Sequence, residues 1–244
     1  LMNDIVLTNF TPITTVIASL DGNNKVITIK SFALNKNTTE YGLFGTLNTY
    51  VDQKTQETQK SILKNVIVDY SQLDSNALQF TNNEMTTITF GGLVANNIGG
   101  LIYNCDVMNK GNVEKAITIL MDNDSTLTFG GLVGENSGVI TNSRVGRREL
   151  TVVKYENGVV ESRTNTYAGL SFVVGNKNPI GDGVKHNMFD SIVGGFVGTN
   201  SGTIASSYVS NTSITSHAEE DDGKLAGFAG RNEKNGIITY SYVR

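Results

Sequence analysis

The chain has 244 residues, a formal net charge of -4 and only 17% charged residues. This weak acidity argues against a nucleic-acid or anionic-membrane partner, and the single cysteine excludes an internal disulfide framework. No apolar run reaches the length of a membrane-spanning helix. The 26 glycines and 2 prolines are typical of a β protein with many tight turns, because proline would remove donors from strand ladders.

The N-terminal part is predicted to form short strands. Residues 1–20 alternate short apolar runs with Thr and Asn, which places Pro12 at a strand start or edge. An Asp-Gly pair at 21–22 supplies a tight turn, and the β-branched run 26–29 predicts the next strand. The polar stretch 49–60 is interpreted as a solvated loop or a short helix.

A short phrase then recurs five times. Its clearest copy is FGGLVGENSGVITNSRV. The copies lie at 41–68, where the phrase is interrupted and degenerate, and at 90–107, 129–145, 193–209 and 225–243. The segments 86–92, 113–121 and 125–131 are β-branched and alternating, which predicts further strands. A fixed motif at unequal spacing indicates repeats with a constant core and variable loops.

The largest interruption of the repeat is an insertion at residues 146–190. An Asn-Gly pair at 157–158 lies between the alternating runs 149–155 and 159–167. Because Asn-Gly between two such runs is the strongest short-range hairpin signal, we predict a β-hairpin that projects from the main body. The rest of the insertion is assigned as a degenerate sixth copy at 168–176 and an irregular loop at 176–190. No stretch of the chain predicts a helix of normal length.

Alignment of the four clear copies places like residues in columns. The apolar columns are Leu93, Leu132, Phe196 and Phe228, then Ile102, Ile140, Ile204 and Ile238, then Val107, Val145, Val209 and Val243. An amide column contains Asn97, Asn136, Asn200 and Asn232, and a glycine column follows at Gly99, Gly138, Gly202 and Gly236. One copy cannot bury its own apolar face, so each copy is expected to stack on the next at the strand spacing of about 4.8 Å.

Such a stack assigns a role to every column. The aliphatic columns form a continuous core, the amides bond along the stack as in cross-β ladders, and the glycines occupy turns that need a positive φ. The predicted fold class is therefore all-β, a right-handed parallel β-helix (β-solenoid) with an inserted β-hairpin. Residues 1–244 are expected to form a single domain, cut from a larger protein.

The phrase G-[LF]-[VF]-G-x-N-x-G-x-I-x-N-S-x-V resembles the GLUG motif, and LDGNNKVITI followed by YGLFG is similar to the way such arrays begin. That repeat recurs in large bacterial surface proteins, adhesin-like proteins and IgA-cleaving metallopeptidases. The resemblance covers roughly residues 18–243, apart from the insertion. It implies a β-solenoid on a secreted or wall-attached bacterial protein, without implying one function.

Several residues depart from the motif. Ala95 and Ala226 replace glycines and Ala229 replaces a valine, while Ser206 and Tyr240 stand where other copies carry Asn.

Few residues are candidates for chemistry. Cys105 occupies the serine column of the phrase and is interpreted as a small core filler, since no histidine lies in the neighbouring copies to activate it as a nucleophile. The two histidines, His186 and His217, are not part of the His-Glu-x-x-His signature of metallopeptidases.

The acidic sequence 217–223 offers oxygen ligands of the kind that calcium prefers. These are the side chains of Glu219, Glu220, Asp221 and Asp222. The sequence lacks the alternating spacing of a calcium loop and is interpreted as a solvated loop tip.

Polysaccharide-cleaving enzymes on β-helices need carboxylates, or a metal with a basic residue, that converge on one face. Asp69 and Asp106 flank the valine column, but no pair of carboxylates repeats on neighbouring copies. The basic residues Lys64, Arg144 and Arg231 are scattered. We assign no catalytic, cofactor-binding or metal-binding residue.

Two tyrosines share the column of Asp106. Tyr208 and Tyr242 are expected to be neighbours on the outer face, where exposed aromatic rings can bind sugars. The simpler interpretation is that they are strand residues that pack along the surface.

We predict a non-catalytic structural or adhesive repeat module of a larger bacterial cell-surface or secreted protein, acting as a rigid stalk or a binding face. The expected partners are a host or neighbouring-cell protein or glycan and the rest of its own polypeptide, with no nucleic acid and no membrane insertion. The hairpin at 146–167 and the adjoining loop form the expected contact region. Two alternatives remain open: an accessory domain that positions a substrate for a surface protease of the IgA-peptidase kind, and a polysaccharide-cleaving enzyme.

Overall fold

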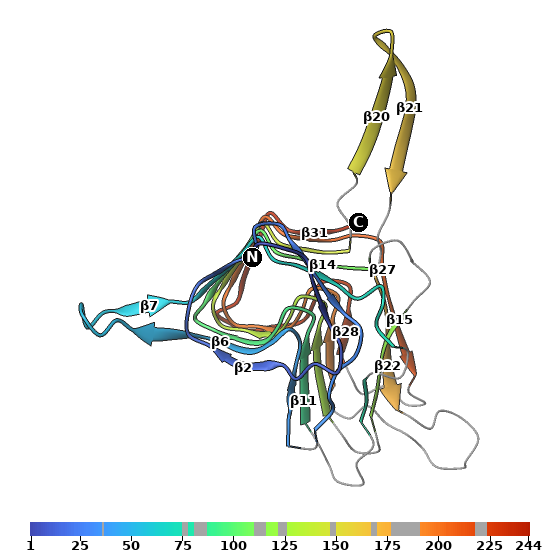
Figure 1. Ribbon diagram of the computed structural model, residues 1–244. Helices are drawn as coiled ribbons and strands as arrows, with labels where there is room; N and C mark the ends of the chain where they lie inside the picture. The colour runs from blue at the N-terminus through green and yellow to red at the C-terminus, as the bar shows by residue number, and fades with distance from the viewer. Residues whose placement is uncertain are drawn as a thin grey trace, which may run out of the picture.

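The chain forms short strands that pair with their counterparts in successive repeats. The computed structural model describes residues 1–35, 37–74, 78–80, 87–109, 116–121, 126–146, 150–166, 170–176, 191–217 and 224–244. These residues form 31 β-strands and no helix (Figure 1). The expectation of an all-β fold is confirmed over this part of the chain.

Five sheets of parallel strands make up the body. Sheet I contains β5 (Glu40–Tyr41), β11 (Thr87–Gly91), β16 (Thr126–Gly130), β23 (Ile192–Gly194) and β28 (Lys224–Ala226). Sheet II contains β2 (Ile13–Val16), β6 (Phe44–Val51), β12 (Val94–Ile98), β17 (Val133–Asn136), β24 (Val197–Asn200) and β29 (Ala229–Asn232). Sheet III contains β3 (Leu20–Asp21), β8 (Ile62–Lys64), β13 (Leu101–Tyr103), β18 (Val139–Thr141), β25 (Thr203–Ala205) and β30 (Ile237–Thr239).

The two remaining sheets of the body complete each repeat. Sheet IV contains β1 (Ile5–Leu7), β4 (Val26–Ile29), β9 (Ile67–Asp69), β14 (Asp106–Met108), β19 (Arg144–Val145), β26 (Tyr208–Val209) and β31 (Tyr242–Val243). Sheet V contains β10 (Leu78–Phe80), β15 (Ala116–Met121), β22 (Leu170–Asn176) and β27 (Thr212–His217). Antiparallel pairing between these strands is confined to two hairpins, β6 with β7 (Thr58–Lys60) and β20 (Leu150–Glu156) with β21 (Val159–Thr166).

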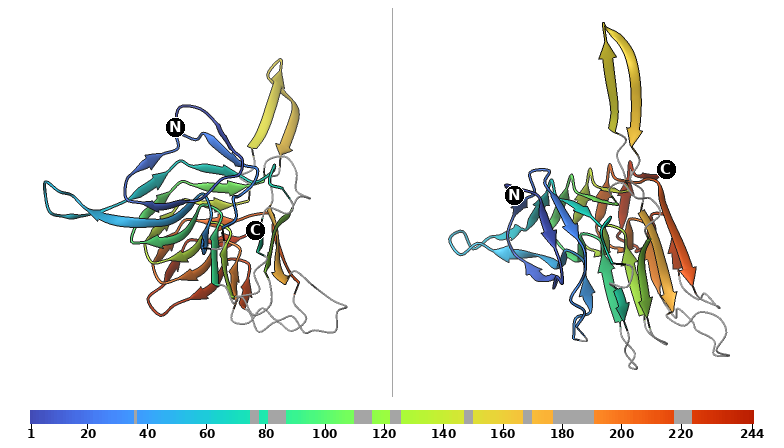
Figure 2. Two further views of the ribbon diagram at one scale, coloured as in Figure 1. Left: turned by 60° about the horizontal axis from the view of Figure 1, so that its bottom comes forward. Right: turned by 45° about the vertical axis from the view of Figure 1, so that its right-hand side comes forward.

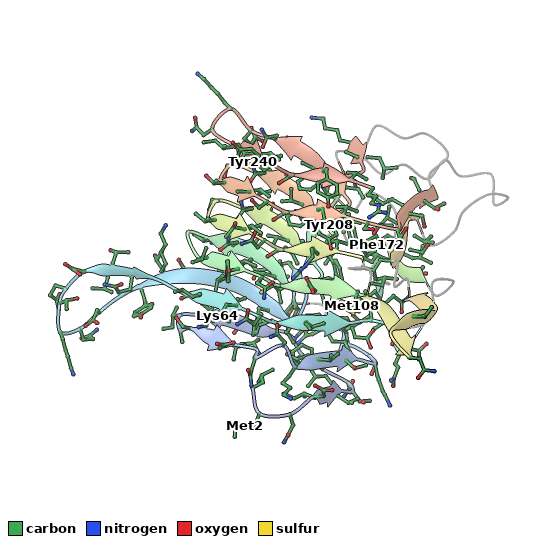
Figure 3. All side chains as sticks on the ribbon, turned by 90° about the horizontal axis from the view of Figure 1, so that it is seen from above. Met2, Lys64, Met108, Phe172, Tyr208 and Tyr240 are labelled. Carbon is green, nitrogen blue, oxygen red and sulfur yellow. The ribbon has the colours of Figure 1, made fainter. Side chains whose placement is uncertain are left out.

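The chain visits sheets I to V in order and then begins again, and we call each such pass a rung. Rung 1 runs from β5 to β10, rung 2 from β11 to β15, rung 3 from β16 to β22, rung 4 from β23 to β27, and rung 5 from β28 to β31. Figures 2 and 3 show the rungs side by side, from the end that carries Met2 to the end that carries Tyr240. Each copy of the phrase supplies the strands of sheets I to IV in one rung.

Two of the three predicted apolar columns are confirmed by the strand register. Ile102, Ile140, Ile204 and Ile238 are successive partners in sheet III, and Val107, Val145, Val209 and Val243 are successive partners in sheet IV. In rungs 2 to 4 the members of both columns are fully or almost fully buried. Burial of one such side chain stabilises the fold by about 1.5–3 kcal/mol, and it is achieved only when a neighbouring rung is present.

Aromatic rings extend the core beneath sheets I and V. Phe90 and Phe129 stack with centroids 5.3 Å apart and ring planes 3° from parallel, and the ring of Phe172 meets Phe129 edge-on at 4.7 Å. Phe172 comes from β22, which pairs in register with β15 and β27. The assignment of 168–176 as a sixth copy of the phrase was therefore wrong: residues 170–176 continue the linking strands of sheet V.

The glycine column needs a different explanation from the one expected. Of its predicted members, only Gly99 has a left-handed φ (+77°). Gly138 pairs with Gly100 rather than Gly99, and a Cβ on Gly138 would lie well under 3.0 Å from the Gly100 carbonyl oxygen. Gly202 and Gly236 have the same close approach to the rung before them. These positions exclude a side chain because the rungs touch there.

Left-handed backbone is instead supplied by another column, at the turn from sheet III to sheet IV. Its members Asn65, Asn104, Asn142, Ser206 and Tyr240 have φ between 50° and 55°. Asn tolerates this conformation better than most residues, which explains the amide that recurs in the phrase. Ser206 and Tyr240 adopt the same turn without that advantage.

Two hairpins project from the body, and only one of them was predicted. The hairpin predicted around 157–158 is confirmed, since Asn157 and Gly158 both have positive φ, as a type I′ turn requires. The interpretation of 49–60 as a loop or short helix was wrong, because β6 continues to Val51 and pairs with β7. The Asp52 carboxylate accepts hydrogen bonds from the backbone N–H groups of Lys54 and Thr55 and closes that turn.

Candidate functional site

The buried asparagines form a continuous hydrogen-bonded ladder along the stack. Nδ2 of Asn97 donates to Oδ1 of Asn136 at 2.8 Å, Asn136 donates to Asn200 at 2.8 Å, and Asn200 donates to Asn232 at 2.7 Å. Each amide also donates to a glycine carbonyl in its own turn. The predicted ladder is confirmed, and its amides serve the fold.

The ladder has a definite first member. The register partner of Asn97 in rung 1 is Leu47, which carries no donor. Oδ1 of Asn97 is consequently buried without a hydrogen-bond partner, while its Nδ2 group is satisfied. All the ladder bonds therefore run from one rung to the rung that follows it in the chain.

The serine column forms a second ladder, which begins at Cys105. The hydroxyl of Ser143 accepts a hydrogen bond from the backbone N–H of Cys105 at 3.2 Å and donates to the Thr141 carbonyl at 3.0 Å. Ser207 and Ser241 repeat this pattern in the next rungs. Cys105 is fully buried, and burial raises the pKa of its thiol to about 12. A thiol in this state is a core residue rather than a nucleophile.

Cys105 is expected to be inert in the folded protein. Because the thiolate is the reactive form and the sulfur is enclosed, iodoacetamide at pH 8 should leave the native chain unlabelled. Mass spectrometry should find full labelling of the same chain in urea. Rapid labelling without denaturant would contradict the buried position.

The outer face of sheet IV carries the residues that the sequence placed in the column of Asp106. Arg144 forms an ion pair with Asp106 through Nε, and its Nη2 donates to Oδ1 of Asn104 at 2.7 Å. Asp69 accepts hydrogen bonds from the backbone N–H and the hydroxyl of Ser71. These acids are held by neighbouring side chains, and each has different partners.

Tyr208 and Tyr242 lie in adjacent rungs on that face, as predicted. Their rings stack with centroids 5.3 Å apart and planes 13° from parallel (Figure 3 labels Tyr208). A sugar would stack on a ring face, and in this pair the two facing surfaces cover each other. The arrangement therefore favours packing along the stack over a sugar-binding platform at Tyr208.

Two further charged residues from the sequence analysis lie in surface ion pairs. Lys64 contacts Asp21 at 3.1 Å, and Arg231 contacts Glu233 at 3.5 Å. Hydrogen bonds from the Asn65 amide, the Asn23 backbone and Lys64 lower the pKa of Asp21 from 3.8 to about 2. Folding therefore stabilises the carboxylate form of Asp21.

The Asp21 contribution to stability should disappear in acid. Since the folded-state pKa lies below the ordinary value, the contribution is complete above about pH 4 and is lost as the pH falls toward 2. NMR titration of the Asp21 carboxyl should give a midpoint near 2. Asn65→Ala and Lys64→Ala should each raise that midpoint, and an unchanged midpoint in both variants would contradict the assigned cause.

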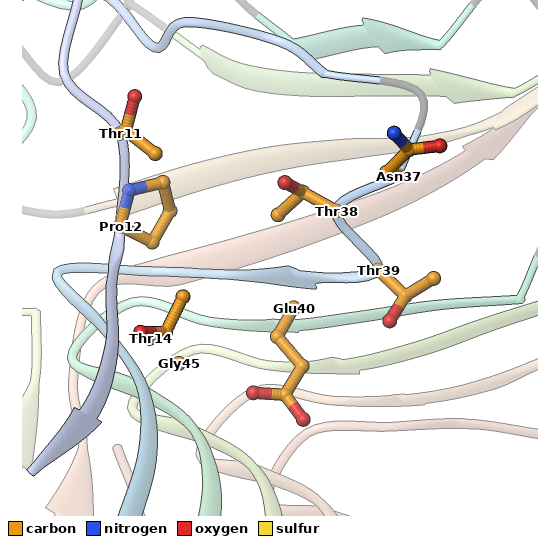
Figure 4. A pocket seen from close by; sticks show the side chains of 8 residues that line it. All are labelled: Thr11, Pro12, Thr14, Asn37, Thr38, Thr39, Glu40 and Gly45. Atoms are coloured by element: carbon orange, nitrogen blue, oxygen red, sulfur yellow. The ribbon is translucent and has the colours of Figure 1, made fainter.

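A small pocket lies where the first strands diverge. It has a volume of about 180 Å³, with Thr11 and Pro12 on one side, residues 37–39 on the other and Glu40 nearby (Figure 4). Glu40 accepts hydrogen bonds from Thr46 at 2.9 Å and Asn96 at 2.7 Å. The volume is below that of typical ligand pockets, and the carboxylate is part of the rung-to-rung bonding. No sequence pattern predicts this pocket, because its walls come from separate segments.

Metal-binding candidates fall mainly outside the described residues. His186 and the acidic group 219–222 lie there, and so does the loop expected at 176–190, apart from residue 176, which belongs to β22. Within the described ranges, no three His, Cys, Asp or Glu side chains gather as a metal site. None of the described residues forms a helix long and apolar enough to cross a membrane.

The most prominent exposed features are the two hairpins. Figure 1 shows β20–β21 projecting from one side of the body and β6–β7 from another. β20 and β21 form a sheet of their own, so both outer edges of this ribbon lack a strand partner among the described residues. The chain matches no family model, no curated protein and no solved structure.

Proposed function

We propose that the chain is a non-catalytic repeat module of the GLUG type, folded as a right-handed parallel β-solenoid. It acts as a stalk or binding face within a larger bacterial surface or secreted protein. The observation that carries this proposal is the asparagine ladder, which links rungs 2 to 5 by bonds of 2.7–2.8 Å. The most regular polar side chains of the repeat thus face along the stack.

A ladder of this kind supports a mechanical role. Each rung is tied to its neighbours by parallel backbone bonds, apolar columns and side-chain ladders, so the stack resists bending and local opening as one body. A rigid body can hold a contact element at a fixed distance from its anchor. That element is most simply the β20–β21 ribbon, whose free edges can pair with an extended segment of a partner protein.

The test is removal of the ribbon without loss of the stack. Residues 150–166 would be replaced by a short Gly-Ser linker, while β22 stays because it pairs with β15 and β27. The matched control replaces residues 50–59 in the β6–β7 hairpin in the same way. Both variants should keep the β-rich circular dichroism spectrum of the parent chain.

Binding would be measured with labelled chains on host epithelial cells and on immobilised host glycoproteins. Loss of the ribbon should weaken binding by about tenfold or more, which corresponds to about 1.4 kcal/mol. The control should bind as the parent does. Unchanged binding without the ribbon would contradict its role as the contact element. Turnover of host protein or of polysaccharides by the parent would contradict a non-catalytic module.

A further inference from the structure

An asparagine followed by a glycine occurs at two places in the chain, 157–158 and 235–236. This dipeptide is chemically labile. The amide nitrogen of the glycine can attack the side-chain carbonyl carbon of the asparagine, and glycine has no Cβ to obstruct the approach. Both asparagines are exposed. Exposure therefore does not distinguish the two pairs, and the difference between them lies in how the structure holds each glycine.

Gly236 is held firmly within the stack. Its N–H donates a hydrogen bond to the Glu233 carbonyl at 2.9 Å, and its carbonyl accepts one from Nδ2 of Asn232 at 2.9 Å. A Cβ on Gly236 would lie well under 3.0 Å from the Asn200 carbonyl oxygen, so the backbone is packed against the preceding rung. The nitrogen that would attack Asn235 is thus engaged, and its peptide group cannot rotate without breaking these contacts.

Gly158 is placed in the opposite situation, at the tip of the β20–β21 ribbon. Asn157 and Gly158 are the central residues of the turn, with φ of 50° and 77°, and the pair Glu156 and Val159 closes it. In such a turn the closing hydrogen bonds come from the flanking residues, so the N–H of the second central residue lies outside the ladder. A Cβ on Gly158 would meet no described atom within 4 Å.

The ribbon tip is also remote from packing that would restrain it. β20 and β21 form a sheet of their own, which projects from the body (Figures 1 and 2). Val159, beside the turn, is 69% exposed. A ribbon of two strands is marginally stable by itself, so it opens locally at a small fraction of the global free energy of unfolding. Such opening gives Asn157 and Gly158 the backbone freedom that ring closure requires.

From these features we propose that Asn157 is a site of spontaneous deamidation, and that the stack protects Asn235 from the same reaction. The nitrogen of Gly158 forms a bond to Cγ of Asn157, and the bond from Cγ to Nδ2 breaks. The side-chain amide leaves as ammonia with the proton that Gly158 gives up. Water then opens the five-membered succinimide at either carbonyl. One opening yields aspartate, and the other yields isoaspartate, in which the main chain runs through the former side chain.

Both products change the ribbon. Each adds a negative charge next to Glu156 in the sequence, to a ribbon in which Glu156 and Glu161 balance Lys154 and Arg163. Isoaspartate also adds a methylene to the backbone of the turn, which then no longer fits the strand spacing of the pair Glu156 and Val159. The ribbon strands should therefore separate as the chain ages, while the stack stays intact. The chemistry needs no enzyme and does not depend on whether the ribbon binds a partner.

The test follows the full chain in neutral buffer at body temperature, with peptide mapping by mass spectrometry at intervals. Conversion at Asn157 should be at least about tenfold faster than at Asn235, which corresponds to a difference of about 1.4 kcal/mol in activation free energy. The same chain in urea is the control, and there both asparagines should convert at similar rates. Asn157→Gln is the matched variant: it keeps the amide, but its ring closure would need a six-membered ring and should be much slower.

Hydrogen exchange of the aged chain should become faster within residues 150–166 and stay unchanged within residues 192–209. Equal rates at Asn157 and Asn235 in the folded chain would overturn the proposal, and so would an intact Asn157 after the time that half-converts the unfolded chain. A tenfold difference that persists in urea would also overturn it, because local sequence and not the stack would then protect Asn235. Unchanged exchange at 150–166 in the converted chain would contradict the effect on the turn. Freshly prepared chain serves the binding tests of the ribbon, so the two proposals can fail independently.

Discussion

Gly131→Ala is expected to destabilise the stack strongly. The added Cβ would lie well under 3.0 Å from the Gly195 carbonyl oxygen and 2.9 Å from a methyl group of Val145. Neither neighbour can retreat, because Gly195 belongs to the next rung and Val145 is buried in the core. The clash should lower the free energy of unfolding by about 3 kcal/mol or more, measured by urea denaturation and circular dichroism.

Gly227 belongs to the same glycine column as Gly131 and provides the control. Gly227→Ala introduces the same methyl group on the outermost rung, where the nearest atoms are 3.7 Å away. This variant should change the free energy of unfolding by less than about 0.5 kcal/mol, as ordinary surface substitutions do. Similar losses in the two variants would contradict close rung-to-rung approach as the reason for glycine.

Asn136→Ala is expected to have the next largest effect. Asn136 is the only ladder member whose two Asn neighbours are both buried. Its removal leaves one N–H of the Asn97 amide and Oδ1 of Asn200 without a hydrogen-bond partner. An unsatisfied buried polar group costs about 1–3 kcal/mol, so the two together should cost about 2–5 kcal/mol. Urea denaturation would measure the loss.

Asn232→Ala is the matched control for the ladder. Asn232 is exposed and accepts a single bond from Asn200, so solvent can replace much of what is lost. The expected cost is below about 1 kcal/mol. A cost at Asn232 equal to that at Asn136 would show that the amides act only within their own turns.

The columns were predictable because stacking converts sequence alignment directly into contact. Once the copies are aligned, the residues equivalent to Asn136 in the adjacent copies are Asn97 and Asn200, and stacking makes them its neighbours. The strand register of Ile140 and Val145 follows in the same way. The Asn-Gly hairpin was predictable for a local reason, since few dipeptides accept two positive φ values in succession.

Other features depend on information that the residue types do not carry. A glycine at position 138 indicates that a side chain is not tolerated there. Either a left-handed turn or a close neighbour can be the reason, and only the structure identifies the close neighbour. The β6–β7 hairpin was not predicted because β7 consists only of the polar residues Thr58, Gln59 and Lys60, and because its turn depends on the Asp52 side chain. Residues 170–176 contain a Gly and apolar residues like the phrase, and their true place depends on pairing with distant strands.

The candidate contact surfaces were predictable only in part. The sequence located the projecting ribbon and the neighbouring tyrosines, but the mutual covering of the two rings follows from their plane angle of 13°.

The one-way direction of the asparagine ladder has an electrostatic consequence. Every amide in the column points its N–H group toward rung 5 and its carbonyl toward rung 2, so the side-chain dipoles add instead of cancelling. Aligned hydrogen bonds polarise one another, as peptide dipoles do along a helix. The two ends of the described ladder thus differ in polarity: the partial positive charge lies toward Asn232, and the partial negative charge of the Asn97 carbonyl is buried opposite Leu47.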